Sequence, residues 1–117
     1  MGELIMMLFH ARTTAHILHL KSRSYAAHVA LNTFYEGIVP LTDSLAEAYQ
    51  GGHGLIAEYP ARYTPYTEPL ELMNSVHEYI TKNRKTVCDV SDTHLQNIID
   101  EIVALTDSTA YKLRFLK

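Results

Sequence analysis

Apolar residues recur every three or four positions along most of the chain, which is the spacing of one face of an α-helix. The first such run extends from residue 3 to about residue 21 and contains neither Gly nor Pro. Ile5, Phe9 and Ile17 are expected to widen its apolar face. The main series of this face consists of Leu4, Leu8, Ala11, Ala15 and Leu18. This pattern predicts a first helix.

A second run begins near Tyr25, after Ser22 and Ser24, which can stop one helix and cap the next. Its apolar series consists of Leu31, Phe34, Ile38, Leu41 and Leu45. Pro40 lies inside this run and removes one backbone hydrogen bond. Because the series keeps its phase across the proline, we expect a kink there. The alternative is a stop and a restart with a capping box from Ser44 to Glu47. Gly51–Gly52 should end the helix.

The segment 58–71 contains three of the four prolines and three tyrosines, which predicts an ordered crossover loop packed on the domain surface. A third helix is predicted from Pro69 to Arg84, with an apolar stripe of Leu72, Met73, Val76 and Ile80. A fourth should begin at Thr93, where Thr93 and Gln96 match a capping box. Its heptad-like series is Ile98, Ile102, Leu105, Thr109, Leu113 and Leu116. No useful alternating strand pattern is present.

These elements predict an all-α fold, an antiparallel four-helix bundle with one long connection between the second and third helices. The 117 residues suit a single domain, 1–117. A net charge of −3 and a pI near 6.1 give no basic field for nucleic acid. The single cysteine, Cys88, excludes an internal disulfide and fits a reducing compartment. Glu3 stands where a signal peptide needs basic residues, and the apolar run there is too short for a membrane span. We therefore expect a cytoplasmic protein with no membrane partner.

The second run also carries a spaced polar series, formed by His28, Asn32, Glu36, Asp43 and Glu47. On one helix His28 and Asp43 lie about 22 Å apart, at roughly 1.5 Å per residue. No single ion could bind both within one chain, so a joint function requires a second helix or an antiparallel second subunit. His16 and His19 lie one turn apart nearby, and imidazole with carboxylate oxygen suits iron, zinc or manganese. Such spacings more often reflect histidines at the border of an apolar face and carboxylates exposed to solvent than metal ligands.

The stretch HILHLKSRSYAAHVALNTFYEGIVPLTDSLAEAYQGG, residues 16–52, resembles the first two helices of the Dps mini-ferritins, which belong to the ferritin-like superfamily. In that family a second histidine follows the first by twelve residues, as His28 follows His16. Acids then follow the second histidine by fifteen and nineteen residues, as Asp43 and Glu47 do here. The segment from Lys21 to Tyr25 resembles the break between the two helices, and residues 92–117 resemble the last helix. The compactness of the chain is similar to that of phage-encoded relatives.

The resemblance implies a ferritin-like fold and an antiparallel homodimer or larger assembly. It also implies a metal site that takes histidines and one acid from one subunit and an Asp and a Glu from its partner. Asn32 stands where the family has an aspartate, so Glu36 would have to replace it. The one-residue shift in the break leaves His16 and His19 as alternative ligands. The basic DNA-binding arm of many family members is absent.

Three functions follow as alternatives. The leading interpretation is a non-catalytic or weakly metal-binding homodimer with an altered site. The second is an active mini-ferritin, a ferroxidase that oxidises and stores Fe(II). The third is a metal-free structural or regulatory module that binds another protein. Cys88 is not expected to be a nucleophile, and His53, His77 and His94 are expected to be cap or surface residues.

Overall fold

Each of the four apolar series forms one α-helix in the computed structural model, which describes residues 1–61 and 64–117. The helices are α1 (Gly2–Lys21), α2 (Tyr25–His53), α3 (Pro69–Val87) and α4 (Thr93–Phe115). The described residues include no strand, so the predicted all-α class and the number of helices are confirmed.

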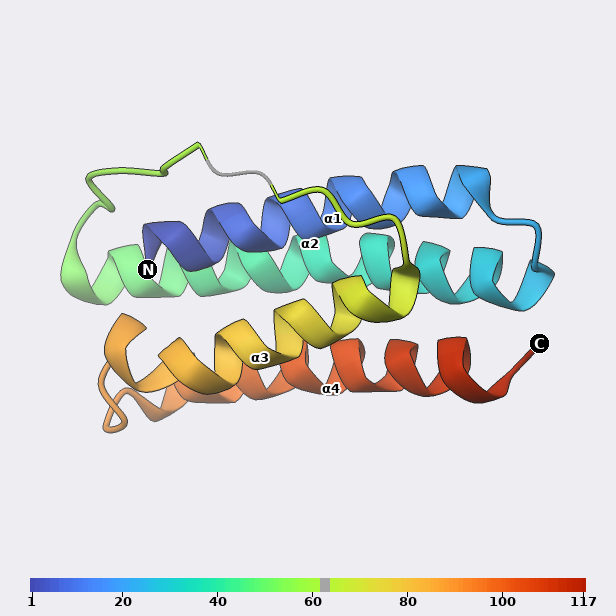
Figure 1. The fold of residues 1–117 in the computed structure, drawn as a ribbon. Helices are drawn as coiled ribbons and strands as arrows, with labels where there is room; N and C mark the ends of the chain where they lie inside the picture. The colour runs from blue at the N-terminus through green and yellow to red at the C-terminus, as the bar shows by residue number, and fades with distance from the viewer. Residues whose placement is uncertain (62–63) are drawn as a thin grey trace.

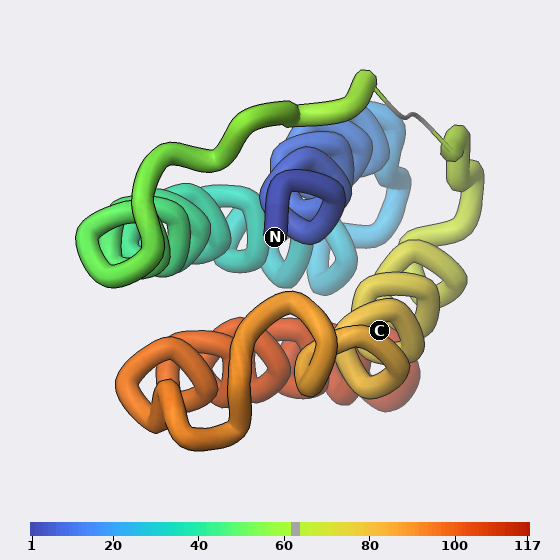
Figure 2. Tube along the Cα trace, turned by 90° about the vertical axis from the view of Figure 1, so that its left-hand side faces the viewer, coloured from blue at the N-terminus to red at the C-terminus, as the bar shows by residue number. Residues whose placement is uncertain are grey.

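The helices form two layers around one core, with α1 and α2 in the first layer and α3 and α4 in the second (Figure 2). Helix α1 contacts α2 and α3, and α4 contacts the same two helices from the opposite corner. Helices α2 and α3 run in the same direction, and α1 and α4 run the other way (Figure 1). The long connection from α2 to α3 therefore returns along the length of the molecule, passing over α1. The molecule measures 43 × 26 × 22 Å.

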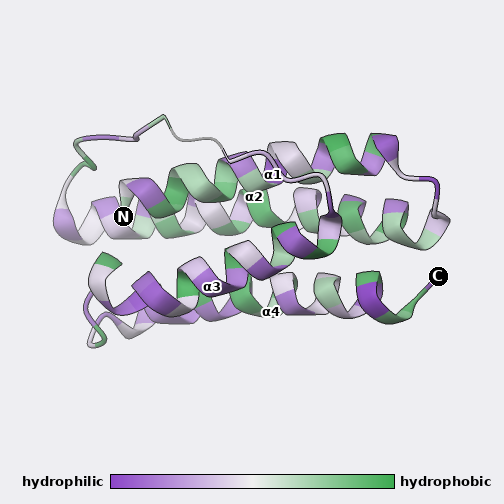
Figure 3. Cartoon of the chain, viewed as in Figure 1, coloured by the Kyte–Doolittle hydropathy of each residue, from purple (hydrophilic) through white to green (hydrophobic). Residues whose placement is uncertain are grey.

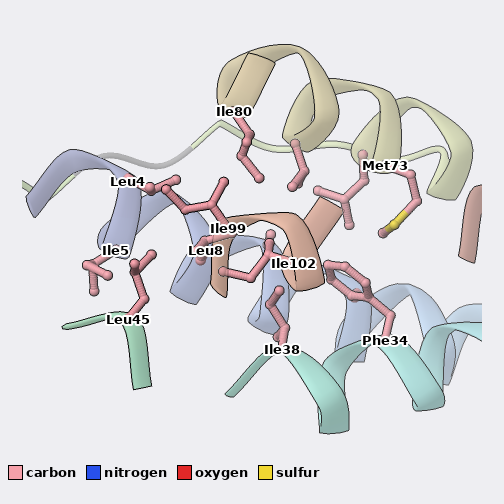
Figure 4. Packing of buried hydrophobic residues seen from close by; sticks show 14 of the residues in the cluster. Leu4, Ile5, Leu8, Phe34, Ile38, Leu45, Met73, Ile80, Ile99 and Ile102 are labelled. Atoms are coloured by element: carbon pink, nitrogen blue, oxygen red, sulfur yellow. The ribbon is translucent and has the colours of Figure 1, made fainter. Parts of the chain in front are cut away.

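The core lies between the two layers and contains the apolar stripes predicted for the first three helices (Figure 4). Phe34 and Ile38 of α2 are fully buried and lie near Ile102 of α4. The prediction that Phe9 and Ile17 widen the buried face of α1 is wrong, since they are 36% and 42% exposed. Ile5, the third residue expected to widen this face, is fully buried.

The buried stripe of α4 shares Ile102 and Thr109 with the predicted series but is otherwise shifted. It consists of Leu95, Ile99, Ile102, Thr106 and Thr109. Leu105 and Leu113 are only half-buried, and Leu116 is exposed. Thr106 and Thr109 can be buried because their hydroxyls donate to the carbonyls of Ile102 and Leu105, both at 2.8 Å. Their methyl groups then face the core.

Helix α2 continues through Pro40 without a break, so the alternative of a stop and a restart is wrong. It also includes Gly51 and Gly52, which were expected to end it. The end comes at Gly54, which has a φ of +91° and whose N–H donates to the carbonyl of Gln50. The left-handed region costs glycine little because it has no Cβ.

The predicted Thr93–Gln96 capping box is wrong, because Gln96 is engaged elsewhere. Its Nε2 donates to the carbonyl of Arg84 at 2.9 Å and to that of Cys88 at 3.3 Å. Its Oε1 accepts from the Nε of Arg84 at 2.9 Å. Asp92 occupies the N-cap position without a side-chain cap bond. Gln96 thus fastens α4 to the end of α3.

The crossover loop is fixed at the end of α2, where Gln50 accepts from the Ile56 N–H and the Tyr59 hydroxyl. A Cβ on Gly2 would lie 2.0 Å from the carbonyl oxygen of Glu58, so the close approach of the loop to α1 requires glycine. Tyr66 packs against the core, as predicted for the tyrosines of this loop. Tyr63, the second of those tyrosines, lies outside the described residues.

Candidate metal centre at the α1–α2 turn

The three-residue connection 22–24 brings the last turn of α1 against the first turn of α2. Ser24 caps α2, as expected, by accepting from the N–H of Ala27 at 3.2 Å. Ser22 is tied to the same turn through its N–H, which donates to the carbonyl of His19 at 3.3 Å. This tight reversal places the histidines at the end of α1 beside the one at the start of α2.

His19 and His28 form a reciprocal pair across the turn. Nδ1 of His19 lies 2.7 Å from the carbonyl oxygen of His28, and Nδ1 of His28 lies 3.0 Å from the carbonyl oxygen of His19. The two rings are stacked, with centroids 3.6 Å apart and an interplanar angle of 21°. His19 is buried and His28 is half-buried. The pair therefore joins the two helices through two hydrogen bonds and one ring contact.

These hydrogen bonds fix the tautomer of both rings. A carbonyl oxygen can only accept, so Nδ1 must carry the proton in His19 and in His28. In the neutral ring Nε2 then keeps its lone pair. A ring whose Nδ1–H is held by a backbone carbonyl is the arrangement commonly seen in metal-binding histidines. The sequence could not show this, because it depends on the path of the backbone at the turn.

A second group joins the histidine pair from the same two helices. The ring of His16 stacks on that of Tyr35, with centroids 4.0 Å apart, and Tyr35 meets His19 edge-on at 5.3 Å. The Tyr35 hydroxyl donates to Oδ1 of Asn32 at 2.6 Å. Tyr35 is absent from the predicted site, although its position three residues after Asn32 places both on one side of α2. That spacing was the available signal.

The predicted carboxylates do not join this cluster. Glu36, Asp43 and Glu47 are exposed along α2. Within residues 1–61 and 64–117, no group of three or more His, Cys, Asp or Glu side chains could hold a metal ion. The structure thus brings together His16, His19, His28 and Asn32. It leaves Asp43 and Glu47 apart from them, as the helix length required, and does not bring Glu36 into the cluster.

Residues 19–113 match a family model described as Family of unknown function (DUF5856). The chain belongs to this family. The matched region includes every candidate site residue except His16. No curated protein and no solved structure matches the chain significantly.

Two further histidines of this DUF5856 chain, His53 and His77, form separate pairs with aspartates. Nε2 of His53 lies 3.1 Å from Asp92, and its ring stacks on Tyr49 with centroids 4.8 Å apart. Nδ1 of His77 lies 2.8 Å from Asp107. Both arrangements fit cap and surface positions, as predicted. They join α2 to the start of α4, and α3 to α4.

Cys88 is buried at the end of α3, near Gln96. Burial raises the pKa of its thiol, and the negative charge of Asp92 raises it further. A raised thiol pKa lowers the thiolate fraction and hence the nucleophilicity of the sulfur. The N–H and hydroxyl of Ser91 lower the pKa of the neighbouring Asp89.

No helix in the described part of the chain has both the length and the apolar character to cross a membrane.

Proposed function

We propose that the chain is a ferritin-like homodimer that binds a divalent metal ion in an altered site between two antiparallel α2 helices. His28, with His16 or His19, supplies imidazole ligands from one subunit. Asp43 and Glu47 of the second subunit supply the carboxylates. The role is metal binding without efficient oxidation of Fe(II).

The observation that carries this proposal is the tautomer of the histidine pair. Both Nε2 atoms are left with lone pairs because both Nδ1 atoms donate to backbone carbonyls. The same hydrogen bonds orient the rings before any ion arrives, which reduces the entropy lost on binding. Imidazole ligands of this kind suit zinc, iron and manganese in mixed nitrogen–oxygen sites.

The distribution of charge along α2 supports a second subunit. Histidines lie at the start of the helix, and the exposed carboxylates of Asp43 and Glu47 lie about four turns further on. An antiparallel copy reverses this order, so each histidine end faces an acidic end. Exposed apolar residues on the same layer, Phe9, Ile17 and Val29, offer surface for such a contact. A twofold axis would use this surface twice.

The donor set fits a bound ion better than it fits iron oxidation. Asn32 is neutral, and its Oδ1 already accepts from the Tyr35 hydroxyl. The site therefore lacks the acid that the resemblance would place there, and exposed Glu36 would have to replace it from one turn away. With less negative charge, the site would stabilise Fe(III) less well. The helix order and the long α2–α3 connection also support a ferritin-like bundle.

The test combines the state of assembly with metal titration. Analytical ultracentrifugation should show a dimer, and calorimetric titration with Zn(II), Mn(II) or anaerobic Fe(II) should show about one site per subunit. His28→Ala and Glu47→Gln should each weaken binding at least about tenfold. His94→Ala, which changes an exposed histidine on α4, serves as the matched control.

Mixing the two variants tests whether the site is shared. In a heterodimer of His28→Ala with Glu47→Gln, one site keeps both side chains and the other loses both. Co-refolding should therefore restore about half of the binding in the mixed dimers, which neither variant shows alone. Binding with no recovery on mixing would refute the shared site. A folded dimer that binds no metal would favour the protein-binding module, and rapid oxidation of bound Fe(II) would favour the mini-ferritin.

A further inference from the structure

Helix α1 ends, α2 begins and α4 ends at the same end of the bundle (Figure 1). These segments carry large apolar side chains that are exposed. Leu20 is 71% exposed, Tyr25 82% and Phe115 63%. Tyr111 lies against Phe115, with ring centroids 5.7 Å apart. Leu116 is exposed beside them. We call this group the apolar tip. Exposure of this extent within one region is typical of an interaction surface.

The apolar tip borders a shallow groove of about 730 Å³ between three helix ends. Its walls are the first turn of α2, the start of α3 and the last turn of α4, and Leu70, Leu113 and Leu116 are among the residues that line it. The groove is therefore lined with aliphatic side chains and open to solvent. It adds apolar surface to the tip, and its polar lining residues are Ser24, Glu68 and Lys117.

Basic residues are concentrated on the same segments, at the end of α1, in the turn after it and at the end of α4. They are Lys21, Arg23, Lys112, Arg114 and Lys117, which make up five of the ten Lys and Arg residues of the chain. The guanidinium of Arg114 lies 5.9 Å from the ring centre of Phe115, so apolar and basic groups are interleaved. Figure 3 shows hydrophobic and hydrophilic residues side by side at the ends of α1 and α4. Glu68 is the acidic residue among those that line the groove. With Glu71 in the first turn of α3, this end carries five basic and two acidic side chains of the described residues, so it is basic although the whole chain has a net charge of −3.

We propose that this end of the bundle docks on the surface of an anionic lipid bilayer. Lys and Arg would lie among the lipid phosphates, and Leu20, Tyr25 and Phe115 would enter the interface between headgroups and acyl chains. Tyr25, Tyr111 and Phe115 can stack on bases, so nucleic acid is the competing ligand that the test must separate. Leu20, Leu70 and Leu116 favour the acyl chains of a lipid, because they offer apolar surface without a ring to stack. The proposal concerns attachment to the surface, since no described helix can span a bilayer. It requires no bound metal ion, although Leu20 and Tyr25 lie beside His19 and His28 at the same turn.

The shape of the molecule suits end-on attachment. The long axis measures 43 Å, several times the screening length of about 8 Å at physiological ionic strength. The acidic residues near the opposite end, such as Glu58 and Asp89, would be screened from the lipid charge. For a single chain, an end-on orientation therefore places the basic residues within the surface field and keeps Glu58 and Asp89 outside it. The antiparallel dimer proposed above would instead bring the acidic end of the partner's α2 beside each tip.

The test measures binding of the full chain to vesicles by co-sedimentation. The probes are vesicles of phosphatidylcholine alone and vesicles with about one third phosphatidylserine, a composition that gives the surface a negative potential. We expect binding to the anionic vesicles only, weakened at least about tenfold by 0.5 M NaCl because salt screens the attraction. Lys112→Gln with Arg114→Gln should weaken binding about thirtyfold, since each basic residue contributes about one factor of five.

Two further variants complete the test. Lys82→Gln with Lys85→Gln removes the same charge from exposed positions of α3 and should have little effect. Leu20→Ser with Phe115→Ser keeps the charge and should weaken the binding that remains at high salt. If the Lys112/Arg114 and Lys82/Lys85 variants weakened binding to anionic vesicles equally, the attraction would be nonspecific and the proposal would be overturned. Failure to bind anionic vesicles, or preferential binding to a single-stranded oligonucleotide, would also overturn it.

Discussion

The pairing of His19 with His28 makes a quantitative prediction for a double-mutant cycle. Each ring donates to the backbone carbonyl of the other residue, so replacing one side chain with alanine leaves the carbonyl that accepts from the other in place. The two hydrogen-bond losses should therefore add. The ring stack is different, because either replacement alone abolishes it. Only the stack should appear as non-additivity.

The magnitudes follow from these contacts. Each hydrogen bond contributes about 1 kcal/mol net, and an aromatic pair about 0.5–1.5 kcal/mol. His19→Ala and His28→Ala should each lower the free energy of unfolding by about 2 kcal/mol, and His19→Ala should have the larger effect because His19 is buried. The double variant should lose about 1 kcal/mol less than the sum of the single variants, which is the contribution of the stack.

Urea unfolding followed by far-UV circular dichroism measures all three values, because the chain is helical throughout its packed regions. His94→Ala is the control and should change stability by less than about 0.5 kcal/mol. The buffer should contain a chelator, since a bound metal would add its own stabilisation. Additive losses in the cycle would show that the stack contributes nothing. Non-additivity well above the range for one aromatic pair would show that the hydrogen bonds themselves are coupled.

Three further predictions test the packing of the bundle. Gln96→Ala should lower the free energy of unfolding, measured in urea, by about 2–3 kcal/mol, since it removes three hydrogen bonds that link α4 to the end of α3. An unchanged free energy of unfolding would show that these hydrogen bonds do not stabilise the packing of α3 on α4. Gly2→Ala should destabilise the protein by about 1–3 kcal/mol, because its Cβ would meet the carbonyl of Glu58. Gly51→Ala should stabilise it by up to about 1 kcal/mol, since nothing lies within 4 Å of that position. Equal effects of the two substitutions would contradict the contact between the loop and α1. Because burial raises the thiol pKa in the folded state, Cys88 should react slowly with a disulfide reagent at pH 8 until the protein unfolds. Its contribution to stability should decline as alkaline pH ionises the thiol of the unfolded chain. Fast reaction of the folded protein would refute both expectations.

The sequence predicts the fold well where apolar side chains alone decide which face is buried. The series in the first three helices, including Leu8, Phe34 and Val76, lie in the core as expected. In α4 the prediction holds for Ile102 and Thr109 but misses Leu95, Ile99 and Thr106. Thr106 is buried because its hydroxyl donates to the carbonyl of Ile102, a contact that depends on the folded backbone. Gln96 was misassigned for a related reason, since its partners come from another helix.

The candidate site was predictable to a smaller extent. The spacing of His16, His19 and His28 follows from one helix and one turn, and the structure brings these three residues together. The contact of Tyr35 with His16 depends on how two helices face each other, which periodicity does not specify. The separation of Asp43 from the histidines was predictable from helix length alone. Whether a second subunit closes that gap is a matter for the heterodimer experiment.

The connection that passes over α1 also has a consequence for how the chain folds. It divides the molecule into two helical hairpins, α1–α2 and α3–α4, each closed by a short turn. Each hairpin can form through local contacts, but the core lies between the hairpins, so neither has an interior of its own. Docking of the two hairpins should therefore be the step that creates stability, and their unfolding should be a single cooperative event. A chain cut within the connection would then retain its fold only as long as the two hairpins remain associated.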